Sequence, residues 1–374
     1  MRKTTGRFAL IVFVVCLFMV LVAGCGNGKA STPGNQQATT EQNSSKDKGM
    51  VALAFRQLSA TWSSGILKGA EDKLKELGYK TTVADANLNP DLQLQQIDTF
   101  VQQKVKGVII VPQDPAAIIP GLEKIKNAGI PLYVVDTQPK GGKWDLFIAF
   151  DNVKGGIKAG EAMEKLLVDK YGPNPKGVVL EIMGDLRHIA AQERSQGFHQ
   201  IMDKYKDIEI VKQPGDWVPD KAFQVTSDLL NKYKDRVIGI TMASDCMAPG
   251  VISAIAKAGL EKPQSDPKHI VVTAIDGDPE ALAMVKQGRI DAIALQPFNY
   301  YGSMAAEYLD KQIQGQKVEF KDGQVIEEKG APWSPAKITY TENGPLMLLN
   351  SSIIPWDINI DDPNLWGNQV KAGK

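Results

Sequence analysis

Val51-Ala52-Leu53-Ala54-Phe55 is a short apolar run followed by a helical pattern over Ser64–Leu77, which predicts a strand and then a helix. Gly107–Val111 is wholly apolar, as expected of a strand that is buried on both faces of a parallel sheet. The alternation continues through the predicted strand Pro131–Val135 to Asp136. It predicts an α/β lobe in which helices cover both faces of a parallel sheet.

The same alternation restarts after Phe147-Ile148-Ala149 and predicts a second lobe of the same kind. We therefore predict an α/β fold with two doubly wound parallel-sheet lobes, joined by a hinge that the chain crosses more than once. The N-terminal lobe is expected to hold residues 50–150 and about 297–330, and the C-terminal lobe residues 151–296. Residues 331–374 are rich in Pro and Trp, and we expect them to form an irregular extension across the lobes.

The N-terminus predicts export from the cell. Three basic residues precede Phe8–Ala23, an apolar run shorter than the roughly 20 residues that a spanning helix needs. Residues 1–24 are therefore predicted to be a signal peptide that is removed. An uncleaved membrane anchor and a leader cut by an ordinary signal peptidase are the alternatives.

The end of this leader, Leu21-Val22-Ala23-Gly24-Cys25, resembles the bacterial lipoprotein signal, in which the cysteine thiol receives a diacylglyceryl group. The resemblance implies that Cys25 becomes a lipidated N-terminus, with the lipid bilayer as a partner. Residues 25–49 are mostly small and polar, so we expect a flexible tether. Together these features predict an extracytoplasmic protein that is lipid-anchored to the cell membrane.

Composition argues against several classes of function. The 43 Lys and Arg residues balance the 43 Asp and Glu residues, without a basic stripe, so we expect no nucleic-acid partner. Removal of the leader and lipidation of Cys25 would leave Cys246 as the only free thiol, and the three histidines have no spacing suited to a metal or a nucleophile. Glycine-rich phosphate-binding and nucleophile-elbow motifs are missing. We expect no metal, no cofactor and no catalytic residue.

Polar and aromatic residues follow the predicted strands of both lobes, where open parallel sheets bind ligands. They are Trp62, Asp136, Arg194, Trp217, Ser244, Asp245, Asp276 and Gln296. Carboxylates, amides and guanidinium groups can form forked hydrogen bonds with sugar hydroxyls, and an indole can cover the apolar face of a sugar ring. Taken singly, each Asp has an alternative as a helix cap or turn residue, and Trp62 has one in core packing. The joint pattern predicts a sugar or polyol in a cleft between the lobes.

Several short stretches, spaced over most of the chain, point to a known family. They are Gly69-Ala70, Leu77-Gly78-Tyr79, Gly129-Ile130-Pro131, Asp151-Asn152-Val153, Gly155-Gly156, Ala190-Ala191-Gln192-Glu193-Arg194, Gly197-Phe198, Asp245 with Met247-Ala248, and Asp276-Gly277. With them, the chain resembles the ribose-binding type of periplasmic sugar-binding protein from Val51 to about Gln316. These proteins are the receptors of ABC importers and have the type I fold.

The resemblance implies a role for each candidate residue. Trp62 and Trp217 would stack on the ligand, Asp136, Arg194, Asp276 and Gln296 would bind its hydroxyls, and Ser244 and Phe150 would border the site. Several contacts of the ribose type are altered, however, at Ala60, Ser63, Val111, Thr137 and Ser244. We therefore expect a monosaccharide other than ribose, a modified sugar, a polyol or a cyclitol.

The resemblance also implies the mechanism. A monomeric substrate-binding lipoprotein of an ABC importer would capture its ligand by hinge closure and deliver it to the membrane subunits of the permease. The alternative is a sugar sensor of the same fold that feeds a chemoreceptor or a kinase. An enzyme with Asp136 and Asp276 as a carboxylate pair is a further rival. A sugar-responsive repressor is disfavoured by the export leader.

Overall fold

The structure is a computed structural model, and it describes residues 47–370. The predicted signal peptide (1–24) and the predicted lipidation site Cys25 lie outside the described residues, as do most of the predicted tether (25–49) and the last four residues of the chain. Of the helices between residues 47 and 370, none has both the length and the apolar character needed to cross a bilayer.

The N-terminal lobe is built on a sheet to which eight strands of the described part contribute, in the order β11-β12-β13-β5-β4-β3-β1-β2. The strands β1 to β5 pair in parallel, β13 adds in parallel to β5, and β11 and β12 are antiparallel additions at the edge. Their bounds are β1 Met50–Phe55, β2 Lys80–Asp85, β3 Gly107–Ile110, β4 Leu132–Val135, β5 Leu146–Phe150, β11 Val325–Ile326, β12 Ala336–Thr341 and β13 Gly344–Leu349.

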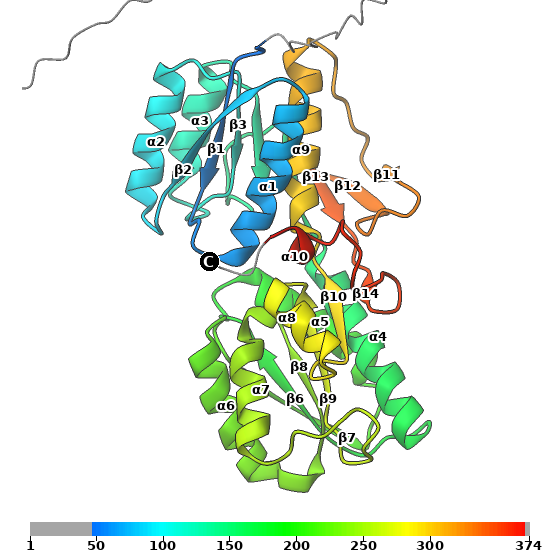
Figure 1. The fold of residues 1–374 in the computed structure, drawn as a ribbon. Helices are drawn as coiled ribbons and strands as arrows, with labels where there is room; N and C mark the ends of the chain where they lie inside the picture. The colour runs from blue at the N-terminus through cyan, green and yellow to red at the C-terminus, as the bar shows by residue number, and fades with distance from the viewer. Residues whose placement is uncertain (1–46, 371–374) are drawn as a thin grey trace, which may run out of the picture. The chain divides into compact units, whose positions relative to one another are not determined.

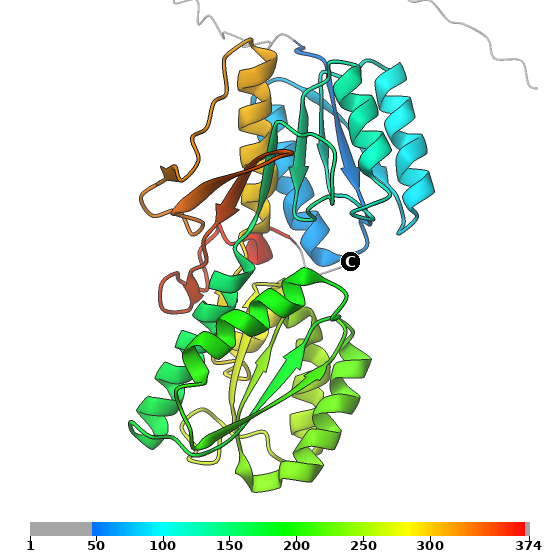
Figure 2. The same ribbon diagram turned by 180° about the vertical axis from the view of Figure 1, so that it is seen from behind.

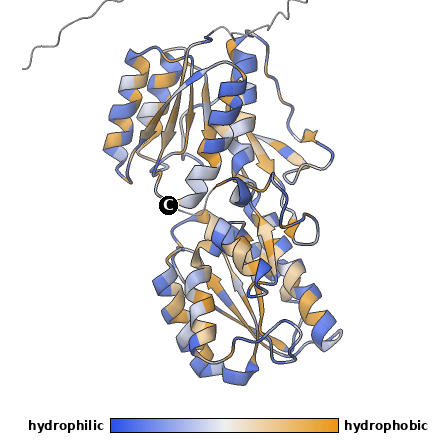
Figure 3. Cartoon of the chain, in the orientation of Figure 1, coloured by the Kyte–Doolittle hydropathy of each residue, from blue (hydrophilic) through white to orange (hydrophobic). Residues whose placement is uncertain are grey.

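Helices cover both faces of this sheet. Successive residues of one strand face different apolar clusters: Leu53 packs with α1 (Thr61–Glu76) and α9 (Phe298–Ile313), whereas Ala54 packs with α2 (Pro90–Gln102) and α3 (Ile119–Asn127). Figures 1 and 2 show these helix pairs on opposite sides. Figure 3 shows apolar strands between helices whose outer faces are polar. A strand buried on both faces has no polar face, which explains the wholly apolar runs in the sequence.

The C-terminal lobe repeats this plan with a sheet of six strands among the described residues, in the order β14-β10-β9-β8-β6-β7. All neighbours pair in parallel except β14, which is antiparallel to β10. Helix α4 packs against α5 and α6 against α7. The bounds are α4 Asn152–Tyr171, β6 Gly177–Met183, α5 Ile189–Met202, β7 Ile208–Pro214, α6 Pro219–Tyr233, β8 Val237–Met242, α7 Ala248–Lys257, β9 Val271–Asp276, α8 Pro279–Lys286, β10 Ala292–Leu295 and β14 Ile353–Ile354. The predicted fold class, two doubly wound α/β lobes, is confirmed.

Within residues 47–370 the chain passes between the lobes at three places: from β5 to α4, from β10 to α9, and from β13 to β14. The crossings are bonded to one another, since Asp151 N donates to Leu349 O at 3.0 Å and Leu295 N donates to Ser352 O at 2.8 Å. This arrangement places the carboxyl ends of both parallel sheets toward each other.

Local chemistry fixes the start of α4 at the first crossing. Helix α4 begins at Asn152 because Asp151 Oδ1 accepts a hydrogen bond of 3.0 Å from Lys154 N. Gly156 allows α5 to approach closely, since a Cβ there would lie 2.0 Å from Arg194 O. The close approach brings Arg194 within reach of Asn152.

Residues beyond 330, which showed no clear pattern in the sequence, form further regular structure. Strands β12 and β13 make a hairpin closed by Glu342 and Asn343, with Thr341 paired to Gly344. After β14, the chain ends its described part in the short helix α10 (Trp366–Gln369), which lies beside the crossings (Figure 1).

Candidate functional site

A cavity of about 440 Å³ lies between the two lobes, at the carboxyl ends of both parallel sheets. This volume is within the usual range for small-molecule sites. Its walls come from segments that follow β1, β4, β6, β7, β8, β9 and β10, and from the starts of α1 and α9. The lining residues include Arg56, Trp62, Asp136, His188, Arg194, Trp217, Ser244, Asp245, Cys246, Asp276, Asp278, Gln296, Phe298 and Trp366.

The structure brings seven of the eight predicted site residues to this one cavity: Trp62, Asp136, Arg194, Trp217, Ser244, Asp276 and Gln296. Phe150 is not among the lining residues. It is the last residue of β5, and its ring lies 5.6 Å from the Arg194 guanidinium carbon. Phe150 therefore packs against the Arg194 guanidinium and does not border the cavity.

Arg194 is the centre of a buried polar network. Its Nη1 donates to Asp276 Oδ1 at 3.0 Å and to Ala243 O at 2.6 Å, and its Nε donates to Asn152 Oδ1 at 2.9 Å. Nη2 donates to Gln296 Oε1, whose amide nitrogen in turn donates to Tyr301 Oη at 2.9 Å. A guanidinium held by this many partners is fixed in orientation before any ligand arrives.

Asp276 is held on both carboxylate oxygens, because Ser244 Oγ donates to Oδ2 while Arg194 donates to Oδ1. The neighbouring Asp245 is buried and accepts hydrogen bonds from Gly277 N at 2.7 Å and Asp278 N at 2.9 Å. Burial, together with the carboxylates of Asp276 and Asp278, raises the pKa of Asp245 well above its usual range. Asp245 thus fixes the loop after β9, which is the turn-type role that is common for an Asp after a strand.

Asp136 forms the acidic part of the N-terminal lobe's wall. Among the described residues its carboxylate receives one hydrogen bond, from Thr137 Oγ1 at 3.0 Å. Burial raises the pKa of Asp136, and the positive charges of Arg56 and Arg194 oppose that shift. A carboxylate with unused acceptor positions is suited to ligand hydroxyls, which can donate to it.

Trp217 is held against the C-terminal lobe by two contacts. Its Nε1 donates to His188 Nδ1 at 3.1 Å, and the rings are nearly parallel, at 17°. The indole also lies directly on Gly184, where an added Cβ would be 1.9 Å from Trp217 Cζ2. Only glycine at position 184 leaves room for the indole in this place.

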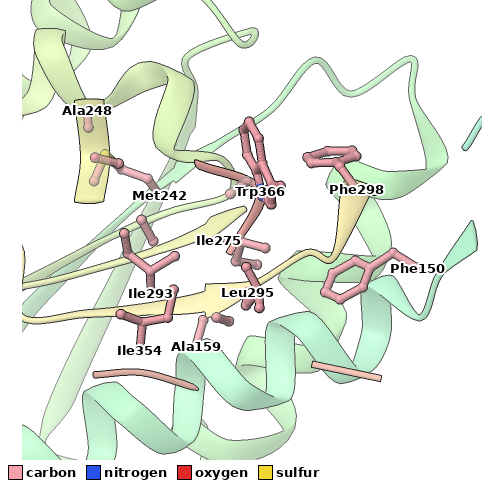
Figure 4. Packing of buried hydrophobic residues seen from close by; sticks show 14 of the residues in the cluster. Phe150, Ala159, Met242, Ala248, Ile275, Ile293, Leu295, Phe298, Ile354 and Trp366 are labelled. Carbon is pink, nitrogen blue, oxygen red and sulfur yellow. The ribbon is translucent and has the colours of Figure 1, made fainter. Parts of the chain in front are cut away.

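Trp62 lies in the first turn of α1 and packs on Phe298, with ring centroids 5.9 Å apart. Phe298 packs edge-on against Trp366 at 5.2 Å. Figure 4 shows Phe298 and Trp366 next to one another, beyond the apolar ends of β9 and β10. The cavity therefore has aromatic walls in both lobes.

Three predicted site residues have backbone conformations that are uncommon for non-glycine residues. The φ angles are 65° at Asp136, 63° at Trp217 and 118° at Asp276. Such conformations persist only where surrounding contacts hold them, and they concentrate at binding sites.

The Cys246 thiol lines the cavity, but burial raises its pKa to about 12, so it is not poised as a thiolate nucleophile. Among residues 47–370, no three His, Cys, Asp or Glu side chains are grouped so that they could hold a metal ion.

Sequence reasoning missed Arg56 and Trp366. Arg56 directly follows β1, and its buried Nε has no hydrogen-bond partner among the described residues. The expectation that site residues directly follow strands, which identified Asp136, also applies to Arg56. Trp366 lies in a segment without periodicity, so no comparable signal existed.

Comparison with known proteins agrees with this architecture. Residues 51–317 match the family model described as a periplasmic binding protein domain. The ribose import binding protein of Bacillus subtilis is 29% identical over 306 residues, which cover 82% of this chain and 93% of that protein. The ribose import binding protein of Escherichia coli is 30% identical over 274 residues, covering 73% and 88%.

A solved structure of a solute-binding protein is also similar to this chain. A solute-binding protein of an ABC transporter from Actinobacillus succinogenes, with bound D-allose, matches with a TM-score of 0.65 and 26% identity, covering 73% of this chain and 94% of that one. Two lobes around one polar cavity, together with these relatives, define a solute-binding protein. The chain belongs to the periplasmic binding protein family, and its predicted resemblance to the ribose-binding type is confirmed.

Proposed function

We propose that this protein captures a monosaccharide or a related polyol between its lobes and delivers it to the permease of an ABC importer. The observation that supports the proposal best is the convergence of Trp62, Asp136, Arg194, Trp217 and Asp276 on one cavity. Indole faces suit the apolar side of a sugar ring, and the acidic and basic groups suit its hydroxyls.

The ligand differs from ribose in this proposal. Ala60, Ser63, Val111 and Thr137 stand where the resemblance implies other side chains, and Ser244 donates to Asp276. Relatives differ in their ligands: two curated relatives are D-apiose import binding proteins, and a Shewanella protein of 26% identity was solved with L-arabinofuranose. D-Ribose, D-allose, D-apiose, L-arabinose and myo-inositol are therefore a suitable first panel.

Capture takes place by closure of the lobes about the three crossings. Closure excludes water from the ligand and strengthens its hydrogen bonds to Asp136 and Asp276. The direct hydrogen-bond partners of Arg194 all belong to the C-terminal lobe, so this lobe binds first and the N-terminal lobe closes on it.

Attachment to the membrane is through a diacylglyceryl group on Cys25, with residues 26–49 as a tether. Lipidation is tested by growing cells that express the protein with a radiolabelled fatty acid. The label is expected in the wild type and not in Cys25→Ala.

The proposal is tested by calorimetric titration of the protein with each sugar of the panel, followed by uptake of the tightest ligand in cells that lack the gene. Micromolar or tighter binding and lost uptake are expected. Binding with normal uptake and a lost sensory response would favour the sensor, and conversion of the bound sugar to product would favour an enzyme.

A further inference from the structure

The C-terminal segment, residues 355–370, lies outside the family match at 51–317 but contributes to the cavity. Its central residue is Trp366, which is 1% exposed and is one of the largest fully buried side chains of the described chain. Asn299 at the start of α9 holds the segment through a hydrogen bond of 3.1 Å from Nδ2 to Asn364 O. Lys286 of α8 pairs with Asp361 at 2.6 Å.

Trp366 touches both lobes at once. On the N-terminal side its indole lies over Gly65 of α1, where an added Cβ would be 3.1 Å from Trp366 Cε3. On the C-terminal side its Nε1 donates to Asp276 O at 3.1 Å. Figure 1 shows α10 at this junction, between α1 and α8.

The hydrogen bond from Trp366 is accepted by a residue with a strained backbone conformation. Asp276 has φ 118°, and its carbonyl accepts hydrogen bonds both from Gln296 N at 3.0 Å and from Trp366 Nε1. The next amide, Gly277 N, is held by Asp245. A strained backbone conformation persists only if its surroundings hold it, so these contacts set the direction of the Asp276 carboxylate.

We propose that Trp366 is a positioning residue for ligand binding: its indole N–H, delivered from the C-terminal segment, holds Asp276 in the conformation that presents the carboxylate to the ligand. This inference rests on the proposed function, since it concerns affinity for the captured sugar. The aromatic ring also completes the row Trp62, Phe298 and Trp366 in the cavity wall.

The test is Trp366→Phe in the full chain, titrated with the panel sugar that binds the wild type most tightly. Phenylalanine keeps an aromatic ring against Phe298 but cannot donate to Asp276 O. Affinity is expected to fall about fivefold, which is the size of one hydrogen bond's contribution. Trp333→Phe is the matched control, because Trp333 is also buried but its Nε1 has no hydrogen-bond partner among the described residues.

A double-mutant cycle separates positioning from a merely structural role. In the Asp276→Asn background, Trp366→Phe is expected to weaken binding much less than in the wild type, because both changes act on one group. Independent, additive effects would overturn the proposal, and so would wild-type affinity in Trp366→Phe. If no panel sugar binds the wild type, the proposed function fails, and this inference fails with it.

Gly65→Ala is a second test, in which the indole is displaced but Trp366 itself is not changed. The added methyl group would push against the indole from the α1 side. The helix itself should not be destabilised, because alanine is more favourable than glycine in a helix interior by about 1 kcal/mol. Lower affinity without a lower melting temperature supports the proposal. Wild-type affinity in Trp366→Phe contradicts it, whatever the result for Gly65→Ala.

Discussion

Arg194 Nη1 donates to Asp276 Oδ1 at 3.0 Å, and both side chains are buried at the base of the cavity. The pair joins α5 to the end of β9, which are 82 residues apart in the chain. Because the two charges compensate each other, a carboxylate and a guanidinium can both be buried in the cavity, where a single charge would be strongly unfavourable. Both groups are then available to ligand hydroxyls.

Arg194→Ala should therefore lower the free energy of unfolding by about 3–5 kcal/mol, because it leaves the Asp276 carboxylate buried without its partner. Urea denaturation measures this change. Lys68→Ala is the control: it breaks the exposed Lys68–Asp72 pair of 2.8 Å and should cost at most about 1 kcal/mol. Equal losses in the two variants would contradict the proposed role of the buried pair.

Trp62→Ala and Trp217→Ala should each weaken sugar binding by about 2 kcal/mol, or roughly 30-fold, because each removes one aromatic wall. Calorimetric titration gives the dissociation constants. Trp356 is 39% exposed and is not among the lining residues, so Trp356→Ala should bind like the wild type. Wild-type affinity in both cavity variants would show that the indoles do not contact the ligand.

Gly184→Ala should displace the Trp217 indole, since the new methyl group would lie 1.9 Å from Trp217 Cζ2. We expect a loss of affinity of about tenfold or more from the shifted aromatic wall. In the Trp217→Ala background the same change has no indole to displace, so it should add little. An equal effect of Gly184→Ala in both backgrounds would exclude this explanation.

His199 predicts a pH dependence of stability. Its Nε2 contacts Glu181 Oε2 at 3.0 Å and its Nδ1 contacts Asp203 Oδ1 at 2.7 Å, and the first of these hydrogen bonds contributes most to raising the pKa of His199. The folded pKa is above the unfolded value of roughly 6.5, so the stabilisation is complete below that pH and is lost as pH rises through the folded pKa.

Urea denaturation of the wild type and His199→Gln at about pH 5.5 and about pH 8.5 measures this contribution. The wild type should lose more stability than the variant between the two values. The same pH dependence in both proteins would show that His199 does not contribute.

Much of the fold is predictable because buried strands and helix faces require apolar residues at regular positions in the sequence. Strand β3 lies under helices on both faces, so Gly107–Val111 has no polar residue. Helix ends are less predictable, because the start of α4 depends on a cap made by Asp151 and not on periodicity. The hairpin β12–β13 is also less predictable, because its loop residues Glu342 and Asn343 are not a dipeptide typical of hairpins and its pairing with β5 is not local.

For the site, the position after a strand points to Asp136, Asp276 and Gln296, because parallel strands share one carboxyl edge. It cannot point to Trp366, which reaches the cavity from a separate segment 90 residues beyond Asp276. Nor can it distinguish Phe150, which supports Arg194, from residues that line the cavity. These distinctions depend on tertiary packing.

The most direct test of the central claim is a crystal structure of the protein with its tightest panel sugar. The account predicts one sugar molecule between the lobes, with the Trp62 and Trp217 indoles against the ring and with Asp136 and Asp276 accepting hydrogen bonds from its hydroxyls. A sugar bound elsewhere, or a closed protein whose indoles pack within their own lobes around an empty interface, would contradict it.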